Sequence, residues 1–361
     1  MEKLVTFAVA AYDSENYLKT CLNSFLILDS SQELQEKRFE VLIINDGSKD
    51  KTEEIAFSYQ KKYPEIFRVK TKVNGGHGSV INYAVKQAAG KYFKVIDADD
   101  WIEKEQLSNY LDRLEQTNAE VVLTHYKTFH IKTGEVIGWK TFLEDYKKEY
   151  TLFDIQKNWK SMDRCLTFHG ITYRTDFYRQ KGIRLEEGVF YEDHQYATIP
   201  CCYAVHIQPL DCSLYCYRIG DKEQSVSEKN QYLRRNHIQI VIVSMCRYWK
   251  ARKSRMGDAG RFYYKEKLSR LILSYLVIVL LSSPIHLDGR IEAREFIKQI
   301  RTDSMEIYQK IRIRYGILIC CNYWKITLEQ YQKILKSPIY NRLRRNKNFQ
   351  SEKGKVSYGD R

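Results

Sequence analysis

The chain has 361 residues, 43% of them apolar, and its 59 basic side chains outnumber the 45 acidic ones for a net charge of +14. A chain of this length and apolar content can bury a core, which excludes an intrinsically disordered protein and a collagen-like repeat. The basic excess is confined to one part of the chain. Residues 1–230 carry 31 basic and 35 acidic side chains, a net charge of −4, whereas residues 231–361 carry 28 and 10, a net charge of +18.

Cysteine usage and hydropathy bear on the compartment. The nine cysteines show no regular spacing, which favours reduced thiols over a disulfide framework. The N-terminus lacks the apolar core and cleavage site of a signal peptide. The longest apolar stretch, Leu271–Leu281, is about half of the ~20 residues that a bilayer-spanning helix needs. We therefore expect a cytoplasmic chain that does not cross a membrane.

The first 130 residues alternate β-rich runs with helical patterns, which is typical of a parallel sheet with crossover helices. Ligands bind such sheets at the carboxyl ends of the strands, so the residues that follow each strand are candidates for the site. In chain order we predict a strand at 5–10, a helix at 15–25, a strand at 39–44, a helix at 52–62, a strand at 67–73, a helix at 79–89, a strand at 92–96, a helix at 104–116 and a strand at 120–126.

The rest of the chain changes character twice. Residues 131–230 have a mixed pattern of short strands and turns. Residues 231–345 show apolar side chains at helical spacing among many Arg and Lys, and 346–361 have the composition of a disordered tail. We therefore predict an α/β fold followed by a helical C-terminal extension.

Acidic residues follow two of the predicted strands. Asn45-Asp46-Gly47-Ser48 comes after the second strand and Asp97-Ala98-Asp99-Asp100-Trp101 after the fourth. Three carboxylates within four residues repel one another, and a divalent cation offsets that cost. Oxygen ligands favour Mg²⁺ or Mn²⁺. The alternative interpretation is a solvated acidic turn that caps the next helix.

A glycine-rich run, Asn74-Gly75-Gly76-His77-Gly78-Ser79, follows the third strand and opens a helix. Glycines allow close approach of the backbone to a ligand, and a helix N-terminus favours phosphate. The run is neither a complete G-x-G-x-x-G nor a Walker loop, so an ordinary turn with His77 as a turn residue is the alternative.

The order of these motifs resembles that of family 2 glycosyltransferases. The resemblance spans about Val5–Ser227, and two positions depart from the family pattern, with Ala10 in place of a proline and Asn45 in place of an aspartate. The motifs that carry it are Val9–Leu18, Asn45–Thr52, Asn74–Gly76, Gly90-x-Tyr92, Asp97–Trp101, His169–Asp176, Glu187–Asp193, Tyr217–Gly220 and Gln224–Ser227.

This resemblance implies the GT-A fold, a Rossmann-like, mostly parallel sheet flanked by helices, over residues 1–230. Residues 1–130 would form the nucleotide-binding half and 131–230 the acceptor-side half. It also implies inverting transfer of a sugar from a UDP-sugar to a hydroxyl of a cell-surface glycan, glycolipid or glycopolymer acceptor, with Mn²⁺ or Mg²⁺ as cofactor.

The resemblance further assigns roles to particular residues. Asp99 would ligate the metal. Asp193 would be the catalytic base, although an acidic pair that begins a short helix at 194–199 is the alternative interpretation. His169, Arg174 and Arg218 have structural alternatives as well, in a tyrosine-rich strand or an ion pair. The nucleotide would contact Ala11, Tyr12, Asp46, Asn74, Gly75, Asp97, Ala98 and Arg218, and the acceptor site or its surroundings would include His77, Asp100, Trp101, His169, Arg174 and Glu192.

The basic clusters at 247–255 and 342–347 leave several partners open. They could bind an anionic membrane surface or a lipid-linked or polymeric acceptor, or they could simply be the solvated faces of additional helices. Nucleic acid is the least favoured partner, and the oligomeric state is open. Membrane binding would place the chain at the inner face of the cell membrane. Two rival functions are a sugar nucleotidyltransferase and a degenerate transferase that serves as a binding module.

Overall fold

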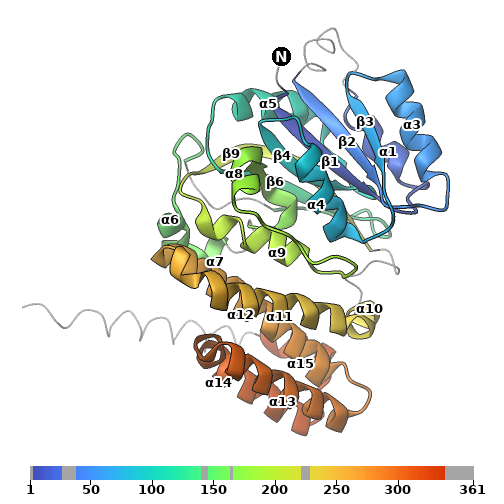
Figure 1. Cartoon of the computed structure of the whole chain (residues 1–361). Helices are drawn as coiled ribbons and strands as arrows, with labels where there is room; N and C mark the ends of the chain where they lie inside the picture. Colours follow the sequence, from blue (N-terminus) through green and yellow to red (C-terminus); the bar gives the residue numbers. More distant parts are fainter. Residues whose placement is uncertain (1–2, 27–37, 140–144, 163–165, 221–227, 338–361) are drawn as a thin grey trace, which may run out of the picture. The chain divides into compact units, whose positions relative to one another are not determined.

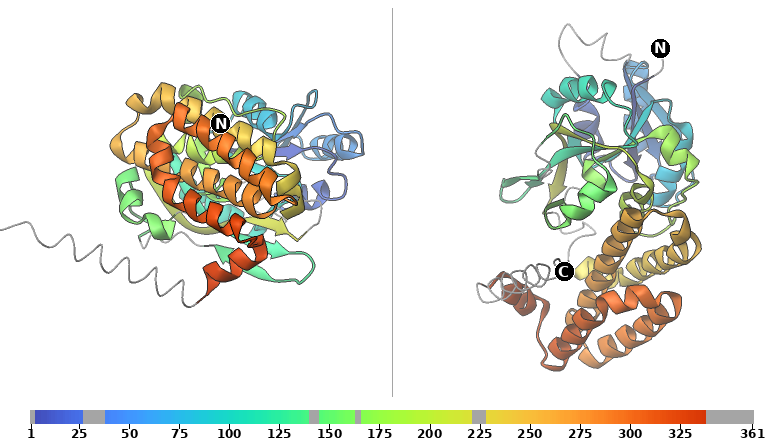
Figure 2. Two further views of the ribbon diagram at one scale, coloured as in Figure 1. Left: turned by 90° about the horizontal axis from the view of Figure 1, so that it is seen from below. Right: turned by 90° about the vertical axis from the view of Figure 1, so that its left-hand side faces the viewer.

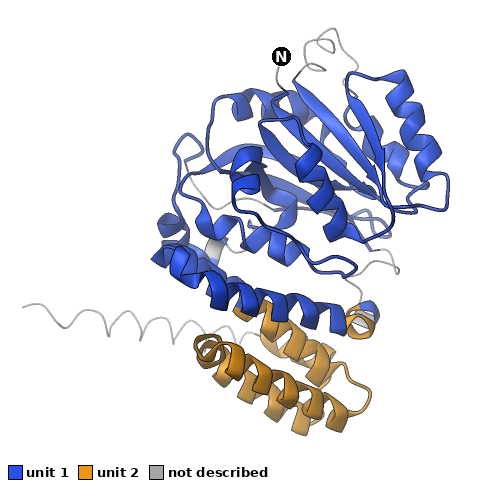
Figure 3. Ribbon diagram, in the orientation of Figure 1, with its two compact units in different colours: residues 1–230, 236–268 blue, residues 231–235, 269–361 orange. Residues whose placement is uncertain are grey.

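The computed structural model of the chain describes residues 3–26, 38–139, 145–162, 166–220 and 228–337. The chain divides into two compact units (Figure 3). We call residues 1–230 and 236–268 the sheet unit, and residues 231–235 and 269–361 the helical unit.

The first half of the sheet is parallel. Strands β1 (Val5–Ala11), β2 (Phe39–Asn45), β3 (Phe67–Thr71) and β4 (Tyr92–Asp97) lie in the order β3-β2-β1-β4 (Figure 1). Every residue of β2 is buried, as expected for a strand covered on both faces. The predicted strands of this half are thus confirmed, and their carboxyl ends meet at one edge of the sheet.

The second half of the sheet is mixed. Strand β8 (Ile171–Arg174) is antiparallel to both β4 and β6 (Val121–His130), whereas β9 (Ile207–Ile219) is parallel to β6. Two short strands complete it by antiparallel pairing, β5 (Trp101–Ile102) with β9 and β7 (Val136–Trp139) with β6. The sheet is therefore parallel from β1 to β4 and mixed beyond them, so β5 and β6 belong to the mixed part although they lie within residues 1–130.

Helices flank the sheet and connect its strands (Figure 1). Helix α3 packs against β2 and β3, and α4 packs against β1 and β2. The first predicted helix begins later than expected, because the backbone N–H groups of Ser14 and Glu15 donate to Thr52 and Asp50 instead of belonging to a helix. The helices are α1 (Leu18–Asn23), α3 (Thr52–Lys62), α4 (His77–Gln87), α5 (Leu107–Glu115), α6 (Leu152–Lys157), α7 (Trp159–Met162), α8 (Thr175–Gln180) and α9 (Asp193–Thr198), with short 3₁₀ turns at 104–106, 168–170 and 201–203.

The sheet unit extends past the boundary predicted at residue 230. It includes most of α11 (Arg235–Arg252) and the first part of α12 (Asp258–Leu281), up to Leu268. Ser244 of α11 donates a hydrogen bond to Glu186 (2.5 Å), and the Tyr263 hydroxyl of α12 donates to the carbonyl of Ala197 (2.5 Å). The shift in charge at residue 230 marks a change in surface composition, and packing continues across it.

The helical unit contains the rest of α12 with α13 (His286–Asp303), α14 (Met305–Tyr323) and α15 (Leu328–Lys336); the short α10 (Glu228–Leu233) precedes α11. Helices α13 and α14 pack against each other (Figure 2). The Tyr275 ring lies 4.4 Å from that of Phe296, and the buried Asn322 amide donates to the carbonyl of Leu280 (2.5 Å). The predicted tail at 346–361 and the basic cluster at 342–347 lie outside the described residues. Among the described helices, none combines the length and the apolar character that spanning a bilayer requires.

Candidate active site

The loops that follow β1 and β2 are bound to each other. Asp50 accepts hydrogen bonds from the backbone N–H groups of Glu15 and Thr52 (2.9 Å each), and the Ser48 hydroxyl accepts one from Asp13 (3.0 Å). These contacts explain why polar residues recur at fixed spacing after the second strand. They hold Tyr12 at the strand edge with its ring 48% exposed.

Asp46 joins the glycine-rich loop to the end of β2. Its buried carboxylate accepts hydrogen bonds from the backbone N–H groups of Gly75 (3.1 Å) and Gly76 (2.8 Å) and from Lys72 Nζ (2.5 Å). Lys72 was not among the predicted site residues, because a lysine between a strand and a loop belongs to no motif.

The glycine-rich loop packs against the segment that precedes α9. Gly76 has a φ of +79°, which glycine adopts without strain, and a Cβ on Gly78 would meet the carbonyl oxygen of Glu186 at 2.1 Å. The backbone N–H of Gly188 donates to the carbonyl of Gly75 (2.6 Å). Residues more than 100 positions apart therefore form one continuous wall of the site.

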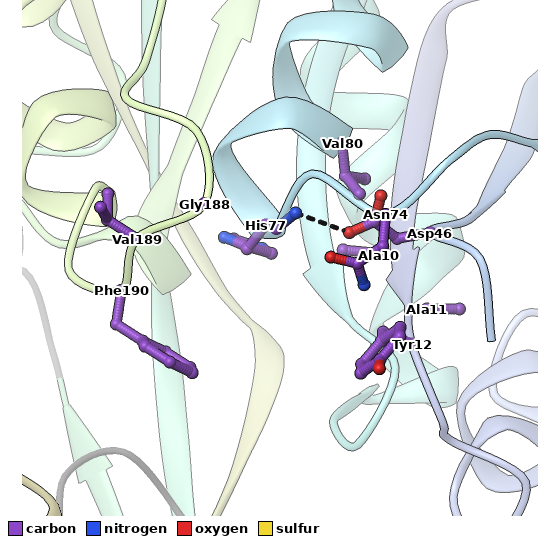
Figure 4. A pocket seen from close by; sticks show the side chains of 11 residues that line it. Ala10, Ala11, Tyr12, Asp46, Asn74, His77, Val80, Gly188, Val189 and Phe190 are labelled. Carbon is purple, nitrogen blue, oxygen red and sulfur yellow. Dashed lines mark hydrogen bonds between the residues drawn. The ribbon is translucent and has the colours of Figure 1, made fainter. Parts of the chain in front are cut away.

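A pocket of about 250 Å³ opens between these segments (Figure 4). The rings of Tyr12 and Phe190 lie on opposite sides of it, with Asp46 and Asn74 near Tyr12 and His77 between the two sides. Its lining consists of Ala10, Ala11, Tyr12, Asp46, Asn74, Gly76, His77, Val80, Gly188, Val189 and Phe190.

The acidic cluster predicted after β4 is present. Carboxylate oxygens of Asp97, Asp99 and Asp100 all lie within 4.8 Å of one another. Asp100 is held by the protein, since it accepts hydrogen bonds from the Tyr215 hydroxyl (2.5 Å) and from the backbone N–H of Arg218 (2.7 Å). Burial and the charge of Asp97 raise the pKa of Asp99 to about 6, and burial with both neighbours raises that of Asp100 well above its usual range.

This donor set fits a hard divalent cation. It consists of carboxylate oxygens alone, which suits Mg²⁺ or Mn²⁺. The raised pKa values of Asp99 and Asp100 reflect negative charge that a cation would relieve, whereas the charge of His77 lowers the pKa of Asp97 despite its burial. Tyr215 and Arg218 engage both carboxylate oxygens of Asp100, whereas Asp97 contacts His77 through Oδ1 alone. Asp97 and Asp99 are therefore the carboxylates with an oxygen available as a ligand.

His77 connects the pocket to the acidic cluster. Its Nε2 lies 2.9 Å from Asp97 Oδ1, and its Nδ1 lies 2.5 Å from Oε1 of the buried Glu192. Burial acts to lower the pKa of His77, but Asp97 and Glu192 outweigh it and raise that pKa well above 6.5. A protonated imidazole therefore bridges the last residue of β4 and the residue that precedes α9.

Asp193, the predicted base, is the first residue of α9 and is half-buried. It lies near His169, whose ring stacks on Tyr217 (4.2 Å) and Tyr126 (5.2 Å). Burial lowers the pKa of His169 to about 4, although Asp97 and Asp193 act in the opposite direction. His169 is thus a neutral side chain between two carboxylates, and its buried Nδ1 has no hydrogen-bond partner among the described residues.

The sequence patterns did not indicate two lysines near the site, the buried Lys94 and the half-buried Lys267. Lys94 in β4 donates hydrogen bonds to the carbonyls of His169 (2.8 Å) and Ile171 (3.2 Å), and burial lowers its pKa to about 7. Lys267 of α12 donates to the carbonyl of Leu166 (2.8 Å). Burial lowers the pKa of Lys267, and the nearby Asp193 opposes this shift without reversing it. A strand and a helix without motifs supply these residues, so the linear pattern held no signal for them.

The structure corrects the expectation for Arg174. It pairs with Tyr92 at the start of β4, whereas Asp97 ends that strand, roughly 16 Å away at ~3.3 Å per residue. Its guanidinium donates to Asp176 (2.7 Å) and to the carbonyl of Asn118 (2.6 Å). Arg174 is a structural residue at the opposite edge of the sheet.

The other predicted residues lie at or beside the cluster. The Arg218 guanidinium lies over the Tyr17 ring (4.2 Å) and acts to lower the pKa of Asp99, so it is near that carboxylate. The Trp101 ring packs on Phe129 (4.9 Å). The buried Ala98 donates its backbone N–H to the carbonyl of Ala10 (3.2 Å).

A sheet with these strand-end loops and an acidic cluster defines a GT-A glycosyltransferase fold. The first 349 residues of S. aureus TarS, solved in complex with UDP-GlcNAc, share it, with a TM-score of 0.60 at 20% identity over 91% of this chain and 92% of that one. Residues 6–178 match the model of glycosyl transferase family 2, so this region of the chain is a glycosyltransferase family 2 domain.

Curated relatives agree with this family. Glycosyltransferase GlyA of Streptococcus pneumoniae serotype 4 is 26% identical over 222 residues, which cover 60% of this chain and 30% of GlyA. Poly(ribitol-phosphate) beta-glucosyltransferase of Bacillus spizizenii is 28% identical over 124 residues, which cover 34% of this chain and 19% of that protein. The chain therefore spans less than a third of the length of either relative.

Proposed function

We propose that the chain is an inverting, metal-dependent glycosyltransferase that moves a sugar from a UDP-sugar to a hydroxyl of a cell-surface glycan, glycolipid or glycopolymer. The observation that carries this proposal is the continuity between the pocket and the Asp97–Asp99 pair through His77. The UDP-GlcNAc complex of the TarS fold supports the donor class, and the poly(ribitol-phosphate) relative supports a polymeric acceptor.

The lining of the pocket supports a uracil base as its ligand. Tyr12 and Phe190 offer rings on opposite sides, against which a flat base can stack. Asp46 faces the same pocket, and a carboxylate has about four acceptor sites, so it can accept the base N–H in addition to its present hydrogen bonds.

Asp97 and Asp99 would hold Mn²⁺ or Mg²⁺. When bound, the cation stabilises negative charge on the leaving diphosphate. His77 and Arg218 add positive charge beside these carboxylates.

Asp193 would accept the proton from the attacking hydroxyl, as inversion requires a base on the acceptor side. Its neighbour Glu192 is buried and bound to His77, whereas Asp193 is half-buried and has no hydrogen-bond partner among the described residues. Asp193 is therefore the carboxylate of this pair that is available for proton transfer.

Asp193→Asn tests the proposal. General-base catalysis contributes ~10²–10⁴-fold, so we expect this variant to lose that factor in transfer and to bind UDP with Mn²⁺ as the wild type does. UDP release from a panel of UDP-sugars measures the reaction, and the shift in melting temperature with UDP and Mn²⁺ measures binding. Asp176→Asn, in the first turn of α8, is a matched control that should remain active. Unchanged transfer by Asp193→Asn would refute the role of this residue.

The rival functions predict different products. A sugar nucleotidyltransferase would release pyrophosphate from UTP and a sugar 1-phosphate, and a binding module would release nothing from a UDP-sugar. The position at the inner face of the cell membrane remains a prediction.

A further inference from the structure

Helix α14 has two apolar faces. One face belongs to the core of the helical unit and buries Ile307, Ile311 and Leu318. Ile313 lies two positions from Ile311, which turns it by roughly 200° around the helix axis, and Ile317 follows four positions later on the same side. Apolar side chains thus point away from the core as well as into it.

The outward face is exposed. Ile313 is 70% and Ile317 53% accessible to solvent, and Trp324, which follows the last residue of the helix, is 77% accessible. We call these three residues the α14 outer stripe. Single exposed apolar residues are common on proteins, whereas two isoleucines on one helix face followed by an exposed Trp mark an interaction surface.

Cations border this stripe. Arg312 and Arg314 flank Ile313, and Lys325 follows Trp324; all three are exposed, and none has an ion-pair partner among the residues that the structure describes. Their charge adds to a C-terminal part that carries 28 basic and 10 acidic side chains. The partner of this surface must therefore be both apolar and anionic.

We propose that the α14 outer stripe lies in the surface of an anionic phospholipid bilayer. Isoleucine side chains gain free energy in the acyl boundary, Trp rings favour the headgroup level, and Arg side chains reach up to lipid phosphates. A second copy of the chain would bring like charges together across a two-fold interface, and nucleic acid offers no partner for the isoleucines. The inference does not depend on the donor or acceptor proposed above.

Co-sedimentation of the full chain with phosphatidylcholine vesicles, with and without phosphatidylglycerol, tests it. We expect binding to the anionic vesicles only, weakening as salt increases. Arg312→Gln with Arg314→Gln should reduce that binding by about thirtyfold, because each charge contributes ~1 kcal/mol. Ile313→Ser with Ile317→Ser should reduce it by about tenfold or more. Ile291→Ser is the matched control, an isoleucine that is 48% exposed on α13, and should bind as the wild type does.

A second measurement is independent of sedimentation. Tryptophan emission should shift to shorter wavelength when anionic vesicles are added, and Trp324→Phe should abolish most of that shift. No binding to anionic vesicles at low salt would overturn the proposal. It would also be overturned if Ile291→Ser lost as much binding as the variant with Ile313→Ser and Ile317→Ser. A wild-type dimer that the Ile313 and Ile317 substitutions dissociate would also overturn it, because a second copy would then cover the stripe.

Discussion

At the scale of single residues, the role of His77 follows from its contacts in the folded protein and not from its neighbours in the sequence. Its imidazole contacts Asp97 at the end of β4 and Glu192 before α9, at 2.9 and 2.5 Å. Neither carboxylate is near it in sequence. Because both are negatively charged and Glu192 is buried, a protonated His77 is the group that makes this arrangement of charges stable.

His77→Gln should therefore destabilise the protein in a pH-dependent manner. A pKa raised in the folded state contributes stability that is complete below about pH 6.5 and is lost as the pH rises through the raised value. We expect the variant to lose roughly 1–3 kcal/mol of unfolding free energy near pH 6, and the gap to the wild type to narrow as the pH rises through the raised pKa of His77. Urea unfolding at several pH values measures this difference.

His206→Gln provides the control. His206 also faces a carboxylate, with Nδ1 3.0 Å from Glu149, but its side chain is 55% exposed. Exposed pairs contribute little, so its removal should change stability slightly at every pH. A gap for His77→Gln that is constant with pH would contradict the charged bridge.

At the scale of elements, the loops of the site are close because the sheet brings distant segments together. The glycine-rich loop at the start of α4 packs against residues 186–192, and Gly78 is the point of closest approach. Motif spacing indicated that both segments were functional. Their mutual contact depends on the antiparallel pairing of β8 with β4 and β6, which lies outside the parallel pattern of the first 130 residues.

Gly78→Ala should separate these loops. Its Cβ would meet the backbone oxygen of Glu186 at 2.1 Å, and backbone atoms cannot move aside as a flexible side chain does. We expect a loss of ~1–3 kcal/mol in unfolding free energy and weaker binding of UDP with Mn²⁺. Thermal unfolding and calorimetric titration measure the two effects.

Gly138→Ala is the matched control, because a Cβ at Gly138 in β7 meets nothing within 4 Å and its φ is not positive. It should leave both stability and UDP binding near the wild-type values. Wild-type binding by Gly78→Ala would show that the loop contact does not shape the pocket.

At the scale of the whole molecule, the candidate site residues and the excess of basic side chains lie in different parts of the chain. The pocket, the acidic cluster and Asp193 all lie in the sheet unit, and residues 1–230 have a net charge of −4. The basic excess lies beyond residue 230, where α14 exposes its outer stripe. The net charge of +14 therefore says little about the reaction.

Hydrogen exchange should show this separation. With UDP and Mn²⁺ at about 100 times the dissociation constant, we expect exchange to slow by up to about 100-fold in residues 45–50, 72–79, 97–100 and 186–193. Amides of α13 and α14 should exchange as in the free protein. Equal protection of α13 and α14 would contradict the assignment of donor binding to the sheet unit.

The sequence by itself determined the parallel strands, the crossover helices, the glycine-rich loop and the acidic strand ends, because each depends on local periodicity or on a few adjacent residues. Only the tertiary structure decided that Asp100 is held by Tyr215 and Arg218, that Arg174 lies at the wrong edge of the sheet, and that α11 and part of α12 belong to the sheet unit. It also decided the positions of Lys72, Lys94 and Lys267. The physical reason is the same in each case: these features depend on contacts between residues far apart in the chain, and linear spacing does not record which distant segments pack together.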